Sequence, residues 1–251
     1  MPVLAYLYAA LLGACIGSFL SVVIHRTPRR ESVVRPRSRC VHCHGQLVWY
    51  HNVPVLSYLG LRGRCAFCGG AISPSYVFVE LGTALVFAGL LHVVGWSLPL
   101  VQYATLAALL IAVAEIDRRH GIIPNGLVAT GAGLGLALLL ATDASALGTH
   151  LPAALATGGL LLLVRVGSAS VLGQPGMGMG DVKLAAMLGL YLGWESLWVF
   201  YLAVVLGGTL GLMGLLTKRL KRGTRLPFAP FIAVATGLHL FLLPPDLFLP
   251  L

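Results

Sequence analysis

Apolar residues occur along this chain in long runs that short polar segments interrupt. A helix that crosses a bilayer needs roughly 20 consecutive apolar residues, and most of the runs have about that length. The pattern predicts an all-α polytopic membrane protein with about eight transmembrane helices. The expected spans are residues 3–24, 76–96, 98–116, 126–142, 151–167, 182–195, 197–217 and 228–243, of which 182–195 is the shortest.

The composition supports the same class. Hydrophobic residues make up 58% of the 251 residues and charged residues only 10%, and the mean hydropathy is +0.90. Soluble globular domains hold about 25% charged residues. Lipid is therefore the main solvent that this sequence predicts.

Positive charge is concentrated in a few segments. Lys and Arg number 17 against 8 Asp and Glu, which gives a net charge of +9. With eight spans and an outside N-terminus, all Lys and Arg residues fall at cytoplasmic ends or loops, where they meet anionic membrane lipid. A nucleic-acid partner is not expected, because the charges form no single stripe. The segments are residues 25–75, Arg118 and Arg119, Arg165, Lys183 and residues 218–225.

Two aspartates stand out because acids are scarce and both fall at the same expected membrane face. Asp117 ends the third span, and Asp181 opens the sixth within the run Gly178-Met179-Gly180-Asp181. Two carboxyl groups held together at a low-dielectric boundary do not both ionise readily. The ionised one can activate water for attack on a peptide carbonyl, while the protonated one donates a hydrogen bond to the oxyanion. The sequence does not assign these two roles.

Each aspartate also has an ordinary structural explanation. Asp181 follows a glycine at a helix start, where Asp is a favoured N-cap, and Asp117 could be a solvated residue beside Arg118 and Arg119. Taken together in a chain so poor in acids, the pair favours a catalytic role. Glu115, the nearest other carboxylate, points about 200° away from Asp117 around a helix and ranks below both aspartates.

Cysteines form a second candidate site. Cys40-Val41-His42-Cys43 and Cys65-Ala66-Phe67-Cys68 are two C-x-x-C knuckles separated by 21 residues. Four thiolates at this spacing suit a tetrahedral, structural Zn²⁺ site, for which His42 and His44 are not needed. A cytoplasmic position disfavours disulfides. The expected parts of the chain are a first transmembrane helix at 1–25, a cytoplasmic zinc-ribbon-like module at 26–75 and a seven-helix membrane domain with both aspartates at 76–251.

Further motifs accompany the knuckles and the aspartates: residues 17–26, Asn52-Val53-Pro54, residues 61–65 and Ile72-Ser73-Pro74. In this order the motifs resemble those of the bacterial prepilin peptidases, also called type IV leader peptidases, which are GxGD aspartic membrane proteases. The resemblance implies an endopeptidase that removes the basic leader of type IV prepilins or pseudopilins. Asp117 and Asp181 carry over as its catalytic pair, and the four cysteines, Cys40, Cys43, Cys65 and Cys68, carry over as metal ligands.

The resemblance also implies a location and a second activity. The location is the bacterial cytoplasmic (inner) membrane, with the active site facing the cytoplasm. Many family members methylate the new N-terminus with S-adenosylmethionine. Three positions depart from the family pattern, and two of them, Ser21 and His51, fall in the amino-terminal part linked to methyl transfer; the third is Asn125. The sequence indicates no residue for binding S-adenosylmethionine.

Two other functional classes stay open at this point. A proton-coupled transporter would use Asp117 and Asp181 as relay carboxylates, but it explains neither their position at one face nor the cysteine module. A non-enzymatic scaffold would use the cysteine module for docking and the aspartates as helix caps. Substitution of the aspartates tests the scaffold class, because a scaffold would keep its function.

Overall fold

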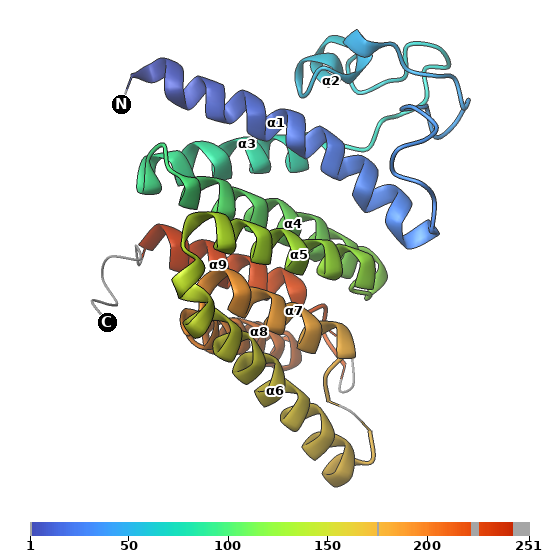
Figure 1. Ribbon diagram of the computed structural model, residues 1–251. Coiled ribbons are helices and arrows are strands. Elements are labelled where there is room, and N and C mark those ends of the chain that lie inside the picture. The colour runs from blue at the N-terminus through green and yellow to red at the C-terminus, as the bar shows by residue number, and fades with distance from the viewer. Residues whose placement is uncertain (1, 175, 222–225, 243–251) are drawn as a thin grey trace. The chain divides into compact units, whose positions relative to one another are not determined.

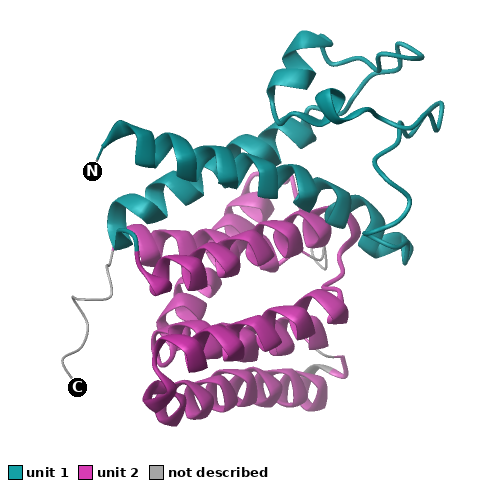
Figure 2. Ribbon diagram, turned by 45° about the horizontal axis from the view of Figure 1, so that its top comes forward, with its two compact units in different colours: residues 1–96 teal, residues 97–251 magenta. Residues whose placement is uncertain are grey.

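The computed structural model describes residues 2–174, 176–221 and 226–242. In these residues the chain forms helices and loops, with two isolated β-bridges and no strand. The all-α class is therefore confirmed. The chain separates into two compact units, residues 1–96 and residues 97–251 (Figures 1 and 2). Two parts of the expected pattern lie outside the described residues. They are the end of the basic run, residues 222–225, and the end of the last expected span, residue 243.

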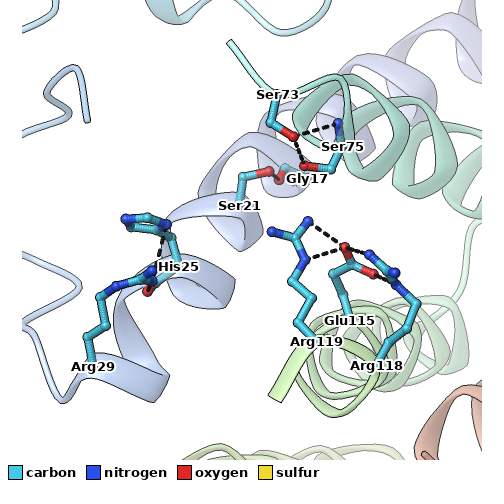
Figure 3. Close-up of polar contacts among 9 residues, drawn as sticks. All are labelled: Gly17, Ser21, His25, Arg29, Ser73, Ser75, Glu115, Arg118 and Arg119. Carbon is cyan, nitrogen blue, oxygen red and sulfur yellow. Dashed lines mark hydrogen bonds and ion pairs between the residues drawn. The ribbon is translucent and has the colours of Figure 1, made fainter. Parts of the chain in front are cut away.

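Unit 1 is built on two long helices, α1 (Val3–Arg26) and α3 (Ser75–Val94). They approach closely because α1 presents glycine where they meet. A Cβ atom on Gly13 would lie 2.7 Å from the carbonyl oxygen of Thr83, and one on Gly17 would lie 2.8 Å from Cα of Glu80. Small residues four apart allow such close helix packing in membranes. Ser21, on the same helix, donates its hydroxyl to the carbonyl oxygen of Gly17 (Figure 3).

The segment between α1 and α3 contains two 3₁₀ turns, η1 (Thr27–Arg29) and η2 (Trp49–Asn52), and the short helix α2 (Leu56–Gly60). Buried Arg26 organises its first part by donating to the carbonyl oxygens of Ser32 and Pro36 at 3.0 and 2.8 Å. Buried Glu80 of α3 accepts a 2.7 Å hydrogen bond from the main-chain N–H of Val55. Charged side chains at the membrane helices thus hold this loop-rich segment in place.

The described residues of unit 2 form six helices and one short turn. A 3₁₀ turn, η3, precedes α6, which contains Pro152 in its first two turns. Tyr191, near the end of α7, is fully buried; its hydroxyl donates to the carbonyl oxygen of Gly131 on α5. The elements are α4 (Leu98–His120), α5 (Asn125–Thr142), η3 (Ala144–Ala146), α6 (Leu147–Leu172), α7 (Met179–Leu192), α8 (Glu195–Leu216) and α9 (Ala229–Leu242).

All eight expected spans coincide with a helix, and six of these helices, α1, α3, α4, α5, α6 and α8, are long and apolar enough to cross a membrane. The chain is a multi-pass membrane protein on this basis. The other two, α7 and α9, have 14 residues each, or about 21 Å, against a hydrocarbon core of roughly 30 Å. The expected three-part division of the chain stays a prediction; contacts within unit 1 group α3 with α1.

Candidate functional site

Asp117 lies in the last turn of α4 and is buried. Its carboxylate oxygen Oδ2 accepts a 3.0 Å hydrogen bond from the main-chain N–H of Ala229, the first residue of α9. The helix ends directly afterwards, because Gly121 adopts a left-handed conformation and donates to the main-chain oxygen of Asp117 at 2.8 Å. A free N–H group at the start of a helix is a natural partner for a carboxylate.

The arginines next to Asp117 in the sequence do not pair with it. Arg118 donates to Glu115 through Nε at 2.7 Å, and Arg119 donates to the same carboxylate through Nε at 2.6 Å (Figure 3). Glu115 therefore pairs with both arginines, whereas the side chain of Asp117 is buried inside unit 2. The interpretation of Asp117 as a solvated surface residue is thus wrong, because it is only 6% exposed.

Asp181 lies in the first turn of α7, ahead of the apolar residues that begin at Val182. Its Oδ2 atom accepts a 3.1 Å hydrogen bond from the main-chain N–H of Gly178, so the side chain does help to cap the helix. Burial and, second, the charge of Asp117 raise the pKa of the Asp181 carboxyl to about 6. The charge of Asp117 thus acts on Asp181 across the turn after α4, against which Gly180 packs.

Glycine at position 180 is what lets the two segments meet. A Cβ atom there would lie 2.7 Å from Cβ of Ile123, which belongs to the turn that follows Asp117. Any larger residue would push α7 away from this turn. On the same helix, Lys183 donates to the side-chain oxygen of Asn125 at 2.9 Å, so its charge is directed to the start of α5.

Two residues of α6 hold the glycine-rich loop before Asp181, and the sequence-based prediction did not include them. The guanidinium of Arg165 donates to the main-chain oxygen of Met177, and the hydroxyl of Ser168 accepts the N–H of Gly176 at 2.9 Å. The signal for Arg165 was its position as a single charge in an apolar span. Its partner is a main-chain atom, which leaves no trace in the sequence.

The four cysteines of the module lie together, as the spacing predicted. Their Sγ atoms are all within 4.8 Å of one another, and Cys40 and Cys68 are 3.9 Å apart at sulfur. Two sulfurs on a tetrahedral Zn²⁺, each at about 2.3 Å, are separated by about 3.8 Å. This distance is far beyond a disulfide bond of roughly 2 Å. The donor set therefore fits a metal ion.

The two knuckles have the same main-chain pattern. Cys40 donates its N–H to Gly45 at 3.0 Å, and Cys65 donates to Gly70 at 2.8 Å. The N–H of Cys43 is the largest of several causes that lower the pKa of the Cys40 thiol to about 7. The pKa of the Cys68 thiol is raised to about 11, despite the N–H of Gly70, by burial and the neighbouring thiols, so Cys40 is the thiol of this pair that favours the thiolate. His42 is directed elsewhere, because its Nε2 atom lies 3.3 Å from the main-chain oxygen of Ala71.

Two family models match the chain. The bacterial peptidase A24 N-terminal domain matches residues 11–94, and the type IV leader peptidase family matches residues 104–213. Curated relatives extend the match over most of the chain. The relative from Burkholderia pseudomallei (strain 1026b), a prepilin leader peptidase/N-methyltransferase, is 35% identical over 261 residues, which cover 93% of this chain and 84% of the relative. The chain belongs to the type IV leader peptidase family.

Other members show the same likeness. A prepilin leader peptidase/N-methyltransferase of Stutzerimonas stutzeri is 34% identical over 93% of this chain and 89% of its own length. One of Myxococcus xanthus (strain DK1622) is 42% identical over 82% of this chain, which spans 62% of that relative. No solved structure matches. The family resemblance read from the motifs is confirmed, the protein is a peptidase of this family, and nothing supports the transporter alternative.

Proposed function

We propose that this membrane peptidase cleaves the basic leader from type IV prepilins or pseudopilins, with Asp117 and Asp181 as its catalytic pair. The observation that carries the proposal is that Asp181 begins α7 where Gly180 packs against Ile123, in the turn that follows Asp117 of α4, in a chain with 8 acidic residues. The relatives are named prepilin leader peptidases, and this supports the substrate class. A prepilin joins its leader to an apolar helix, which reaches a membrane enzyme through lipid.

The environments of the carboxyl groups support a division of roles. Asp117 accepts the N–H of Ala229, a bond that favours the ionised carboxylate and opposes the cost of its burial. Asp181 holds a proton up to about pH 6. Asp117 then takes a proton from water as the water attacks the scissile carbonyl, and Asp181 donates a hydrogen bond to the carbonyl oxygen as it becomes an oxyanion. A proton passed to the leaving nitrogen completes hydrolysis without a covalent enzyme intermediate.

The remaining assignments extend the same proposal. The cysteine cluster holds a structural Zn²⁺ through Cys40, Cys43, Cys65 and Cys68. The protein lies in the bacterial inner membrane with both aspartates at the cytoplasmic face. This orientation is supported by Arg118, Arg119 and Lys183, which lie at the same end of unit 2 as the pair. Methylation of the new N-terminus with S-adenosylmethionine stays a prediction, and the hydrolysis described above does not involve it.

The test is cleavage of a purified prepilin by the full chain in liposomes. Asp117→Asn and Asp181→Asn should each abolish cutting while the thermal unfolding midpoint stays near that of wild type. Glu115→Gln is the matched control. It also removes a carboxylate from α4, but one that Arg118 and Arg119 already neutralise. Folded aspartate variants that still cut at the wild-type rate would contradict the catalytic assignment.

A further inference from the structure

The end of unit 2 away from the aspartates contains a second candidate site. A cavity of about 450 Å³ lies between the start of α4, the end of α5, the start of α6 and the end of α7. Gln102 on its wall and Asp117 are 15 residues apart on α4, or about 22 Å along the helix axis. In Figure 1 this end of unit 2 lies at the left, where α5 passes into α6. The cavity is therefore separate from the peptidase site.

The volume of this cavity is within the range of small-molecule sites, and its wall has two kinds of surface. Leu98, Pro99 and Leu139 supply apolar surface, while Gln102, Asp143 and His150 supply polar atoms. Leu98 is 56% exposed, and Leu140, next to Leu139, is 48% exposed. The apolar side of the cavity thus continues into the surface that unit 2 presents to lipid.

Asp143 supplies the carboxylate of the cavity wall, and its Oδ1 atom accepts the N–H and hydroxyl of Ser145. His150, on the same wall, lies 3.0 Å through Nδ1 from the main-chain oxygen of Leu190. Hydrogen bonds from Ser145, first from its hydroxyl, lower the pKa of Asp143 and keep its charge negative.

Lys and Arg are absent from the wall of this cavity. An occupant with a positive charge and several N–H donors complements the Asp143 carboxylate, and a primary ammonium has three such donors. A metal ion fits less well, because among the described residues only the four cysteines form a group of three or more ligands at metal-binding distances.

We propose that this cavity binds the primary ammonium headgroup of a phospholipid. The ammonium group contacts Asp143, and the glycerol and upper acyl chains lie against Leu98 and Pro99. The lipid belongs to the leaflet opposite the peptidase site, because the two sites lie at opposite ends of α4. It ties the ends of four helices of unit 2 together.

The experiment is native mass spectrometry of the delipidated full chain, titrated with three phospholipids that share the same acyl chains. Phosphatidylethanolamine should be retained about tenfold more than phosphatidylglycerol, which has no cation, and more than phosphatidylcholine, whose cation has no N–H donor. Asp143→Asn should remove this preference. The substitution keeps an oxygen to accept from Ser145, and Asp143→Ser is a second variant that keeps a helix-capping oxygen.

Glu195→Gln is the matched control, because Glu195 is a carboxylate at the same end of unit 2 that pairs with His239 at 2.7 Å and does not line the cavity. It should retain phosphatidylethanolamine as wild type does. Equal retention of phosphatidylethanolamine and phosphatidylglycerol by wild type, or an undiminished preference in both Asp143 variants, would overturn the proposal. So would free ethanolamine that displaces the lipid at equal concentration. None of these readouts depends on peptidase activity.

Discussion

The main-chain N–H of Ala229 donates a 3.0 Å hydrogen bond to the carboxylate of Asp117, although 112 residues separate them. A helix N-terminus carries partial positive charge, so the start of α9 is a fixed electrostatic partner for Asp117. A carboxylate that acts as a base must be oriented before water arrives, and a main-chain donor in a helix loses little freedom when it forms this bond. Helix α9, the last helix among the described residues, is therefore a component of the proposed peptidase site.

Replacement of Ala229 tests this component. Ala229→Pro removes the N–H, and proline is tolerated at the first position of a helix. We expect the cleavage rate to fall about 10- to 100-fold, the effect of losing one hydrogen bond to a charged group. Ala229→Ser is the control, because it keeps the main-chain N–H and adds a side chain of similar size. The prediction is wrong if both variants fold and cut prepilin equally well.

The pH dependence of cleavage follows from Asp181. Its pKa is raised to about 6, so between about pH 4 and pH 6 the folded protein keeps a proton that an ordinary aspartate would lose. If Asp181 donates the hydrogen bond to the oxyanion, kcat/KM falls as pH rises through about 6. The profile measured in liposomes reports an apparent value for the pair. A profile that instead rises through pH 6 would reverse the two roles.

The contacts from α6 to the loop predict a positioning role for Arg165. Arg165→Leu leaves the main-chain oxygen of Met177 without its donor, and we expect kcat to fall about tenfold, as for one charged hydrogen bond, with KM nearly unchanged. Arg165→Lys should restore part of the rate. Steady-state cleavage of a prepilin peptide gives both constants.

Ser168 and Ser170 make a matched pair for the same loop. Ser168→Ala removes the acceptor of the Gly176 N–H, whereas Ser170 bonds only to its own helix, at the main-chain oxygen of Gly167. We expect a lower kcat for Ser168→Ala alone, by a few-fold. Equal rates for the two variants would show that the loop does not need this contact.

Metal removal should act on unit 1. Cys40→Ser or Cys65→Ser should reduce bound zinc from about one ion per chain to well below that, and should make residues 26–75 sensitive to protease, because a structural zinc site contributes folding energy. Cys15→Ser is the control, since Cys15 is an exposed residue of α1 and does not belong to the four-cysteine cluster. Metal analysis and limited proteolysis give the two readouts. Full zinc content in both ligand variants would exclude the proposed site.

The sequence predicted the positions of eight apolar helices, six of them long, because apolar runs mark spans directly. It placed helix ends less well. The fifth expected span was 151–167, whereas α6 runs from Leu147 to Leu172. The extra turns contain His150 and Ser168, polar residues that hydropathy reads as loop. In the structure these residues bond to neighbouring segments, His150 to Leu190 and Ser168 to Gly176, so tertiary contacts offset their polarity.

The aspartate pair and the cysteine cluster were predictable for different reasons. The cysteine spacing is itself a geometric signature of a metal site, and the aspartates had to share a membrane face once the spans were counted. The groups that hold them were not predictable. Ala229 acts through its main-chain N–H, and Met177 acts through its main-chain oxygen. Every residue has such an oxygen, and every residue except proline has such an N–H. Only folding shows which main-chain groups meet a side chain.

Helices α7 and α9 are shorter than a bilayer is thick, and both begin at the aspartates. Each of these helices is about 9 Å shorter than the roughly 30 Å hydrocarbon core. Lipid cannot satisfy the free main-chain N–H groups at a helix start, so we expect water to reach these starts or the bilayer to thin over them. Short helices would thereby admit water, the second substrate of the proposed hydrolysis, to the aspartates.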